Sequence, residues 1–348
     1  VYGEVDDGVD MYPELYLGRA PVENASEAAN WIAKMNTYEK PPACGHELDM
    51  LFLAMILWTD PYTDSGEGLD HIDELYVPER FDPITKLYES SGNGTRTAAI
   101  NALNAGPNIV NHDGHAYTTV MGVGHQEYLS ISDMDMLTND ERPSVLYSIG
   151  CFPAAIDYDC IAEHYVTNAG GGGVAFVGNS RYGWGSPGNP LYGYSDRFDQ
   201  QFFRMLFDEG IEHIGQTVAA AKSLYVPFAQ QANVYRWCEF EINLLGDPEM
   251  PIWTDTPTEM TVSCPTVLPL GAALCPVTVT RTDDGSPVEG ARVCVLDDSG
   301  VYETGVTGID GRVQFEFTTT TPAAFVYVTA TAKNMIPNVT IATLQSTD

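Results

Sequence analysis

The pattern of hydrophobic and polar positions changes near Asp255. Before that residue, short apolar runs typical of buried strands alternate with segments whose apolar residues recur every three or four positions, as in amphipathic helices. After it, segments rich in Val and Thr alternate with turns rich in Gly, Pro and Asp, and helix-forming residues become rare. The pattern predicts two domains, residues 1–255 and 256–348, joined by the short linker Asp255-Thr-Pro-Thr.

The first domain is predicted to alternate strands with helices. The first helix follows the N-cap residue Asn24 and carries an apolar face that ends at Tyr38. Further helices are predicted at 95–103, 156–167 and 196–207, and strands at 15–18, 51–58, 108–111, 144–149 and 173–177. This alternation is typical of an α/β fold, in which helices flank a mostly parallel sheet. Reacting groups in such sheets gather at the carboxyl ends of the strands.

The second domain is predicted to be all-β. Turn signals at Asp284-Gly285 and Asp310-Gly311 separate several of its strands. Five strands are predicted, at 260–263, 275–280, 291–295, 311–317 and 324–328. Short strands with regular turn signals favour a small β-sandwich, and we expect an immunoglobulin-like one.

The net charge of the chain argues against some classes of binding partner. The 348 residues include 48 Asp and Glu but only 16 Lys and Arg, which gives a formal net charge of −32. This charge repels phosphate backbones and anionic membrane surfaces, so nucleic-acid binding is not expected. The longest apolar run, Leu51–Trp58, is far shorter than the roughly 20 residues that span a bilayer, so no membrane span is expected.

Two loops combine residue types that perform nucleophilic chemistry. The first contains Gly114-His115 and the second contains Gly150-Cys151, and each follows a predicted strand at its carboxyl end. Neighbouring strands of one sheet would bring this imidazole and this thiol to the same edge. A thiolate that attacks a carbonyl, with an imidazole that protonates the leaving amine, is the machinery of a thiol peptidase.

Other interpretations of these residues are available. Cysteine is among the residues most often buried, so Cys151 taken alone is more typical of core packing than of catalysis. His112 and His125 near His115 suggest metal binding, but their spacing matches no recognised zinc site. Calcium is plausible at clustered carboxylates such as Asp64 with Glu67 or Asp133 with Asp135, although none has an EF-hand pattern, and no metal ligand is assigned.

Several motifs in order resemble the gingipain-type cysteine peptidases, a family of the caspase-like clan. They are Val110-Asn-His-Asp-Gly-His-Ala, Ser148-Ile-Gly-Cys-Phe, Asp159-Cys-Ile-Ala-Glu-His, Gly173-Val-Ala-Phe-Val-Gly-Asn-Ser and Gly183-Trp-Gly-Ser-Pro, flanked by Val1-Tyr-Gly-Glu and Asn243-Leu-Leu-Gly-Asp-Pro. The resemblance covers residues 1–255 and implies a caspase-like sheet flanked by helices. An immunoglobulin-like domain that follows directly is also a family trait.

The resemblance implies roles for individual residues. His115 matches the catalytic histidine and Cys151 the nucleophile, and the backbone N–H groups of Ala116 and Cys151 match the oxyanion hole. The family usually has Gly after the histidine and Ala before the cysteine, whereas this chain has Ala116 and Gly150. Both exchanges replace one small residue by another, so we expect the dyad to survive. Cys160 matches a second, non-catalytic cysteine.

Three more residues match the substrate pocket of the family. Asp70 is similar in position to the carboxylate that pairs with a substrate arginine, and Asp60 to an acidic group near the histidine. Trp184 resembles the aromatic wall of the pocket. A buried carboxylate at the base of a pocket would favour a guanidinium through a bidentate pair. The competing interpretations are solvated acids for Asp70 and Asp60 and ordinary core packing for Trp184.

The sequence therefore predicts a cysteine endopeptidase that cleaves after a basic residue, Arg before Lys, through a thioester. A catalytically idle adhesion or binding protein and a transpeptidase or self-processing protein remain alternatives. We expect polypeptide substrates, no cofactor for the chemistry, a structural calcium ion at most, and a secreted or cell-surface location. The resemblance also implies an N-terminal segment or pro-part ahead of the match to Val1, and we expect that part to be missing from this chain.

Overall fold

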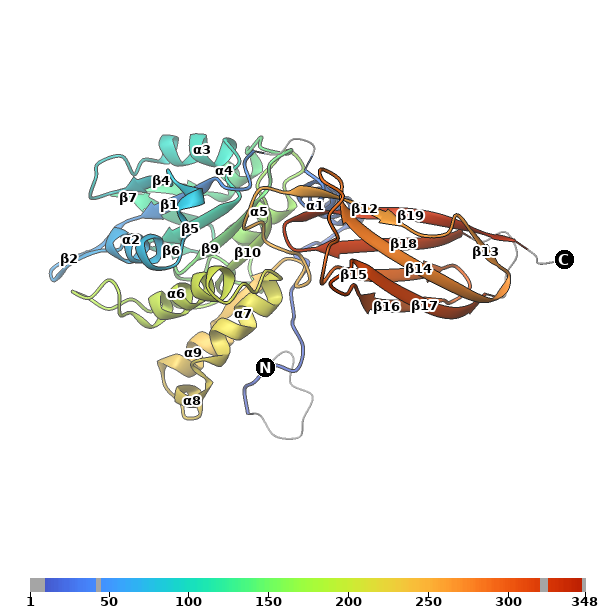
Figure 1. Ribbon diagram of the computed structural model, residues 1–348. Helices are drawn as coiled ribbons and strands as arrows, with labels where there is room; N and C mark the ends of the chain where they lie inside the picture. Colours follow the sequence, from blue (N-terminus) through green and yellow to red (C-terminus); the bar gives the residue numbers. More distant parts are fainter. Residues whose placement is uncertain (1–9, 42–44, 320–324, 346–348) are drawn as a thin grey trace. The chain divides into compact units, whose positions relative to one another are not determined.

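The computed structural model describes residues 10–41, 45–319 and 325–345, which form two compact units, Val1–Asp255 and Thr256–Asp348 (Figure 1). The motif that begins at Val1 and the cysteine Cys44 lie outside the described residues. The units are an α/β unit and an all-β unit, and each has its own hydrophobic core.

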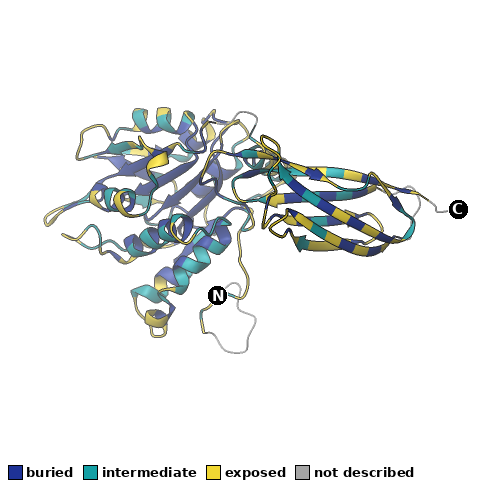
Figure 2. Ribbon diagram, viewed as in Figure 1, coloured by how far each residue is buried: buried dark blue, intermediate teal, exposed yellow. Residues whose placement is uncertain are grey.

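A six-stranded sheet forms the centre of the α/β unit. Its order is β11-β10-β9-β5-β1-β4, and all neighbouring pairs are parallel except β10 with the edge strand β11. The strands are β1 (Met50–Ala54), β4 (Thr85–Tyr88), β5 (Ile109–Asp113), β9 (Ser144–Ser148), β10 (Gly173–Asn179) and β11 (Ile242–Leu245). Strands β1, β5, β9 and β10 are buried at every position, as the dark strands in Figure 2 show. The predicted mostly parallel sheet is confirmed.

Helices cover both faces of this sheet because alternate strand residues point to opposite faces. Phe52 packs in a core with residues of α2, α6 and α7, whereas Leu51 and Leu53 pack in a second core with residues of α3, α4 and α5. The helices are α1 (Ala25–Glu39), α2 (Gly66–Leu75), α3 (Arg96–Asn104), α4 (Ile131–Asp135), α5 (Ile161–Thr167), α6 (Tyr194–Phe207), α7 (Ile214–Ser223), α8 (Val226–Ala229) and α9 (Val234–Glu241), with a 3₁₀ turn at Glu79–Phe81.

Two small sheets extend from the edge of the main sheet at which β1 and β5 end. One is a hairpin of β2 (Ile56–Thr59) and β3 (Tyr62–Asp64) that follows β1. The other contains β6 (Ala116–Tyr117), β7 (Val120–Gly124) and β8 (Glu127–Ser130), and it begins directly after His115. These additions place more chain around the predicted dyad than the sequence pattern indicated.

The predicted first helix is confirmed, since the side chain of Asn24 accepts hydrogen bonds from the backbone of Ser26 and Glu27. The strand predicted at 15–18 is wrong. Residues 15–18 form no strand, and only the next residue, Arg19, makes an isolated bridge, with Leu245 of β11.

Two other predicted boundaries are corrected. The run 51–58 is divided at Met55, whose N–H makes the last bond of the β1–β5 ladder, to the Asp113 carbonyl oxygen, and also donates to the Ser65 hydroxyl, before β2 begins at Ile56. The helix predicted at 156–167 begins only at Ile161, because the chain after Cys151 first forms turns.

The all-β unit has more strands than predicted. They are β12 (Thr258–Ser263), β13 (Val267–Pro269), β14 (Gly271–Arg281), β15 (Arg292–Asp297), β16 (Tyr302–Val306), β17 (Arg312–Thr319), β18 (Phe325–Ala332) and β19 (Met335–Gln345). Strand β12 pairs first with β19 and then with β14, so it joins the layer of β16, β15, β18 and β19 to the layer of β14 and β17. Buried and exposed residues alternate along these strands, and the buried ones form one core. Immunoglobulin-like connectivity stays a prediction.

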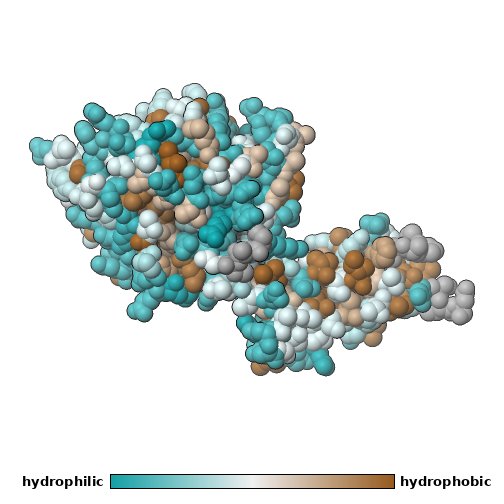
Figure 3. Space-filling view, turned by 90° about the horizontal axis from the view of Figure 1, so that it is seen from above, coloured by the Kyte–Doolittle hydropathy of each residue, from teal (hydrophilic) through white to brown (hydrophobic). Residues whose placement is uncertain are grey.

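The two units differ in surface hydropathy. Figure 3 shows hydrophilic side chains over much of the visible face of the α/β unit, whereas apolar groups are frequent on the visible face of the all-β unit. No helix within the described residues is long and apolar enough to cross a membrane.

Candidate active site

The two dyad loops leave the sheet side by side. Strands β5 and β9 are parallel neighbours, and His112 is paired with Ser148 in their register. His115 follows His112 by the same number of residues as Cys151 follows Ser148. Because parallel strands end at the same edge, equal offsets bring His115 and Cys151 to the same edge of the sheet.

Close backbone packing holds the loops together on both sides of the dyad. A Cβ atom added to Gly150 would lie 2.6 Å from the Cβ of Ala116 and 2.8 Å from the carbonyl oxygen of Gly114, so only glycine fits. The rings of Tyr117 and Phe152 are in contact, with centroids 5.4 Å apart. The structure therefore brings together the two loops that the sequence singled out.

The imidazole of His115 is exposed and is oriented by the hairpin after β1. Its Nε2 donates to the carbonyl oxygen of Leu57 at 2.9 Å, and the ring meets the edge of the Trp58 ring at a centroid distance of 6.1 Å. A carbonyl oxygen only accepts, so the proton lies on Nε2 and leaves Nδ1 as the basic nitrogen. Sequence reasoning had treated Leu57 and Trp58 only as the end of a strand and missed this support.

The thiol of Cys151 is half-buried beneath a segment that follows β10. The backbone N–H of Gly183 donates to its Sγ at 3.3 Å. Burial raises the pKa of the thiol, the Gly183 N–H opposes that rise, and the negative charge of Glu241 adds to it. The resting thiol is therefore protonated. Within the described part of the chain, the hydrogen bonds of His115 and Cys151 go to backbone groups and not to each other.

The backbone around the thiol is held in an uncommon conformation. Phe152 has φ +65°, a left-handed value that costs a non-glycine residue free energy and persists only where the surroundings enforce it. The side-chain amide of Asn179 donates to the carbonyl oxygens of Ile149 and Gly150 at 2.9 and 3.0 Å, and the Phe152 N–H donates to the carbonyl oxygen of Arg181. These bonds fix the direction in which the thiol points.

His112 has a structural position beneath the dyad. It is fully buried, its Nε2 donates to the carbonyl oxygen of Gly122 at 2.7 Å, and its Nδ1 accepts from the Ser148 hydroxyl at 2.8 Å. Burial lowers the pKa of this imidazole to about 4, so it stays neutral. Both ring nitrogens are engaged, and the metal-binding interpretation of His112 is wrong.

Trp184 lies next to the residue that contacts the thiol. Its backbone N–H donates to the Ser195 hydroxyl at 2.9 Å, and its indole N–H donates to a carboxylate oxygen of Glu241 at 3.3 Å. Burial raises the pKa of Glu241 to about 7. The following residue, Gly185, packs against the Trp58 ring, where a Cβ atom would lie 2.8 Å from the ring. This segment therefore contacts both the thiol and the aromatic support of the imidazole.

The two predicted pocket acids are bonded or exposed. Asp70 lies on α2, is half-exposed, and accepts from the Lys86 ammonium at 2.6 Å and from the Tyr88 hydroxyl at 2.9 Å. Asp60 is exposed in the turn between β2 and β3, while the imidazole is oriented by the Leu57 carbonyl. A substrate cation at Asp70 would have to compete with Lys86.

A second acidic group, which sequence reasoning missed, lies behind the histidine loop. Asp113, Asp196 and Asp199 are 2%, 4% and 2% exposed, and the side-chain amide of Asn111 donates to Asp199 at 2.9 Å. As ionised carboxylates, Asp113 and Asp196 have buried oxygens without a donor. Burial raises the pKa values of both, to about 7 for Asp196, and the two facing carboxyls share a proton. The signal in the sequence was an Asp directly before Gly114-His115.

Metal ligands are not indicated by the geometry. Within residues 10–41, 45–319 and 325–345, no group of three His, Cys, Asp or Glu side chains is arranged to hold an ion. Asp133 is bonded to Arg96 and Ser130, and Asp135 to His164. Structural calcium therefore stays a prediction.

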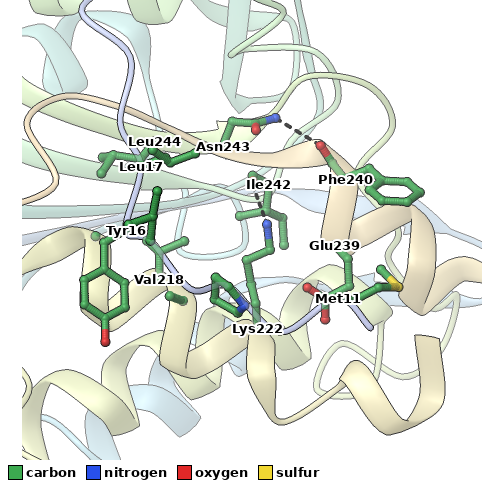
Figure 4. A pocket seen from close by; sticks show the side chains of 14 residues that line it. Met11, Tyr16, Leu17, Val218, Lys222, Glu239, Phe240, Ile242, Asn243 and Leu244 are labelled. Atoms are coloured by element: carbon green, nitrogen blue, oxygen red, sulfur yellow. Dashed lines mark hydrogen bonds between the residues drawn. The ribbon is translucent and has the colours of Figure 1, made fainter. Parts of the chain in front are cut away.

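A pocket of the α/β unit lies elsewhere. It encloses about 160 Å³ between the segment from Met11 to Leu17 and elements α7, α9 and β11 (Figure 4). Lys222 donates there to the Ile242 carbonyl oxygen at 3.0 Å, and burial raises the pKa of Glu239 to about 7. None of the predicted site residues lines this pocket.

Known proteins share this fold and sequence pattern. Gingipain R2 of Porphyromonas gingivalis is 24% identical over 335 residues, which cover 88% of this chain and 44% of that protein. The chain thus spans less than half of that relative. The crystal structure of the Arg-specific cysteine proteinase gingipain R superimposes with a TM-score of 0.81 at 18% identity, covering 99% of this chain and 78% of the other.

A second solved structure, the complex of the pro- and mature domains of a Porphyromonas gingivalis gingipain, matches with a TM-score of 0.78 at 19% identity, over 99% of this chain and 80% of the other. At these identities the structural matches establish the fold. The sequence model of peptidase family C25 matches residues 1–253, which is most of the chain. This chain belongs to peptidase family C25, the gingipain-type cysteine peptidases.

Proposed function

We propose that the α/β unit is a cysteine endopeptidase with Cys151 as nucleophile and His115 as its acid–base partner. The observation that carries this proposal is the equal offset of both residues from the paired strands β5 and β9, together with the packing of Gly150 against Ala116. Family membership supports the same reaction class.

The reaction starts from the protonated thiol of Cys151. Since burial raises the pKa of the thiol, the basic Nδ1 of His115 removes the thiol proton as the sulfur attacks the substrate carbonyl carbon. The Gly183 N–H, which already donates to Sγ, stabilises the developing thiolate. Backbone N–H groups of Ala116 and Cys151 hold the oxyanion, and the imidazolium protonates the leaving amine. Water then hydrolyses the thioester and regenerates the thiol.

We assign a preference for a basic residue ahead of the scissile bond, Arg before Lys. The related solved structure is that of an Arg-specific proteinase. A carboxylate must supply this preference, and the chain offers two kinds: Asp70, already paired with Lys86, and the buried pair Asp113 and Asp196. Trp184 would form the pocket wall beside the thiol, and Asp60 would lie at its rim.

Turnover of Arg-, Lys- and Leu-terminated fluorogenic peptides tests the reaction class. Cys151→Ala and His115→Ala should each lower kcat/KM by at least ~10³-fold, because each removes a group that acts on reacting atoms. Cys294→Ala, in the all-β unit, is the matched control and should retain activity. Turnover that survives in folded Cys151→Ala would remove the dyad from the proposal.

The specificity is tested with Asp70→Asn and Asp196→Asn on matched Arg and Leu peptides. A carboxylate that pairs with the substrate in a desolvated pocket contributes ~2–5 kcal/mol to the Arg substrate and little to Leu. A solvated acid contributes ~1 kcal/mol or less. Selective loss in one variant identifies the residue, while equal small effects in both would exclude these two carboxylates, and equal turnover of Arg and Leu peptides by the wild type would contradict the basic preference.

Two alternatives use the same scaffold. A transpeptidase would resolve the thioester with an amine, so added amino-acid amides would appear in the product at the expense of hydrolysis. A catalytically idle binding protein would show no turnover of any peptide by the wild type. We further propose polypeptide substrates and a secreted or cell-surface location. We also propose a pro-part, because a related gingipain was solved as a complex of its pro- and mature domains.

A further inference from the structure

Two cysteines face the same core in the all-β unit. Strands β12 and β14 are antiparallel, with Val262 paired with Val279 and Ser263 with Thr278. Continuing this register places Cys264 opposite Val277, two residues from Cys275 on the same face of β14. Cys275 is fully buried in the core, and Cys264 packs against that core while half-exposed.

The segment between these cysteines is itself tied to the core. Residues 265–274 contain β13, which pairs with β19, and Leu268 of β13 is only 1% exposed. A covalent link between Cys264 and Cys275 would therefore close a short loop whose two ends already lie beside each other. Closing such a loop lowers the conformational entropy of the unfolded chain and changes the folded structure little.

The two thiols interact with each other. A hydrogen bond from the Cys275 thiol lowers the pKa of Cys264 to about 7, and the same interaction raises the pKa of Cys275. The remaining cysteine of this unit differs, since Cys294 is half-exposed on β15 opposite Thr304 and Thr329, and burial raises the pKa of its thiol. Among the three cysteines of this unit, only Cys264 and Cys275 combine a half-exposed residue with a second thiol beside it.

We propose that Cys264 and Cys275 form a redox site. Reaction with a small-molecule disulfide oxidises the two thiols to an intramolecular disulfide. The Cys264 thiolate attacks one sulfur of the reagent RS–SR, forms a mixed disulfide and releases RS⁻. The Cys275 thiolate then attacks the Cys264 sulfur and releases the second RS⁻. Two protein thiols are oxidised, one reagent disulfide is reduced, and the two thiol protons end on the two RSH molecules.

Peptide mapping of the oxidised full-length protein tests this proposal. The native chain is incubated with bis(2-hydroxyethyl) disulfide, which is uncharged and is therefore not repelled by the net charge of −32. After denaturation, free thiols are alkylated and the chain is cleaved after Leu, since Leu268, Leu270 and Leu274 separate the two cysteines whereas no Lys or Arg does. The expected product is a Cys264–Cys275 linked peptide pair that lacks the mass of two hydrogens and separates on reduction.

Matched variants keep the outcome clear. Cys294→Ser should form the same linked pair, whereas Cys264→Ser should leave Cys275 alkylated. Alkylation of both cysteines in the oxidised wild type, separate reagent adducts on each, or a link from either one to Cys294 would overturn the proposal. The readout does not involve peptide turnover, so it stands apart from the proposed peptidase activity.

Discussion

The two units differ in whether their buried polar side chains have hydrogen-bond partners. In the all-β unit, buried Asp297 accepts bonds from Ser299 and Val301, and buried Thr307 both donates to Val288 and accepts from Ala291. Among the described residues, every buried side-chain oxygen or nitrogen without a partner belongs to the α/β unit. An unpaired buried polar group costs ~1–3 kcal/mol, so the α/β unit retains unfavourable groups that the other unit avoids.

Some of these unfavourable groups lie beside the dyad loops. Asp113 directly precedes the histidine loop, and Asn179, whose amide nitrogen holds the cysteine loop, has a carbonyl oxygen without a donor. Functional sites often contain such strained or poorly satisfied groups, because they are arranged for a ligand and not for folding. The contrast is consistent with the proposal that the α/β unit carries the peptidase chemistry.

The largest expected effect is a loss of stability in a matched pair of core substitutions, one in each unit. Phe202→Ala and Phe315→Ala each remove a buried ring, and each should lower the free energy of unfolding by ~3–5 kcal/mol. The Phe202 ring contacts Tyr147 on β9 with centroids 5.0 Å apart, so its loss should also reduce kcat/KM in the folded fraction. Urea unfolding and peptide turnover measure both quantities. An equal loss of turnover in Phe315→Ala would break the contrast.

The second effect concerns the pH dependence of stability. Because burial raises the folded-state pKa of Asp196 to about 7, the folded protein holds a proton between pH ~4 and 7 that the unfolded chain releases. This contribution to stability is present at low pH and is lost as pH rises through 7. The loss is at most ~4 kcal/mol for a shift of about three units.

Asp196→Asn should therefore flatten the decline in the free energy of unfolding between pH 4.5 and 7.5, as urea titrations at several pH values would show. Asp298→Asn, in an exposed turn of the all-β unit, is the matched control and should leave the profile unchanged. If the free energy of unfolding depends on pH in the same way in wild type and Asp196→Asn, the buried acidic pair does not contribute to the pH dependence of stability.

The smallest expected effect is on activity when the all-β unit is removed. Both dyad loops belong to the α/β unit, which has its own core, so a chain ending at Asp255 should keep kcat/KM within ~10-fold of the full chain. The matched peptides used for specificity serve as substrates. A folded chain that loses more than this, about 1.4 kcal/mol of transition-state stabilisation, would show that the β-sandwich helps to build the site.

Sequence reasoning succeeded where the signal was local. The capped helix after Asn24 and the all-buried strands of the main sheet follow from residues that are near one another in the chain. It failed at 15–18, whose apolar residues suggested a strand although only the next residue, Arg19, makes a bridge to β11. An apolar run carries no information about whether a neighbouring strand has free backbone groups at that position.

The sequence by itself determined the α/β architecture and the position of the division near Asp255, and it supplied His115 and Cys151 as the candidate dyad. Periodicity, turn residues and short motifs encode these features within a few residues of each other. Only the tertiary structure decided that the Leu57 carbonyl orients the imidazole and that the Gly183 N–H reaches the thiol. It also decided that Asp113 meets Asp196, and it placed Cys264 beside Cys275. Contacts of this kind depend on how separate segments pack, and the pattern along one chain does not specify that packing.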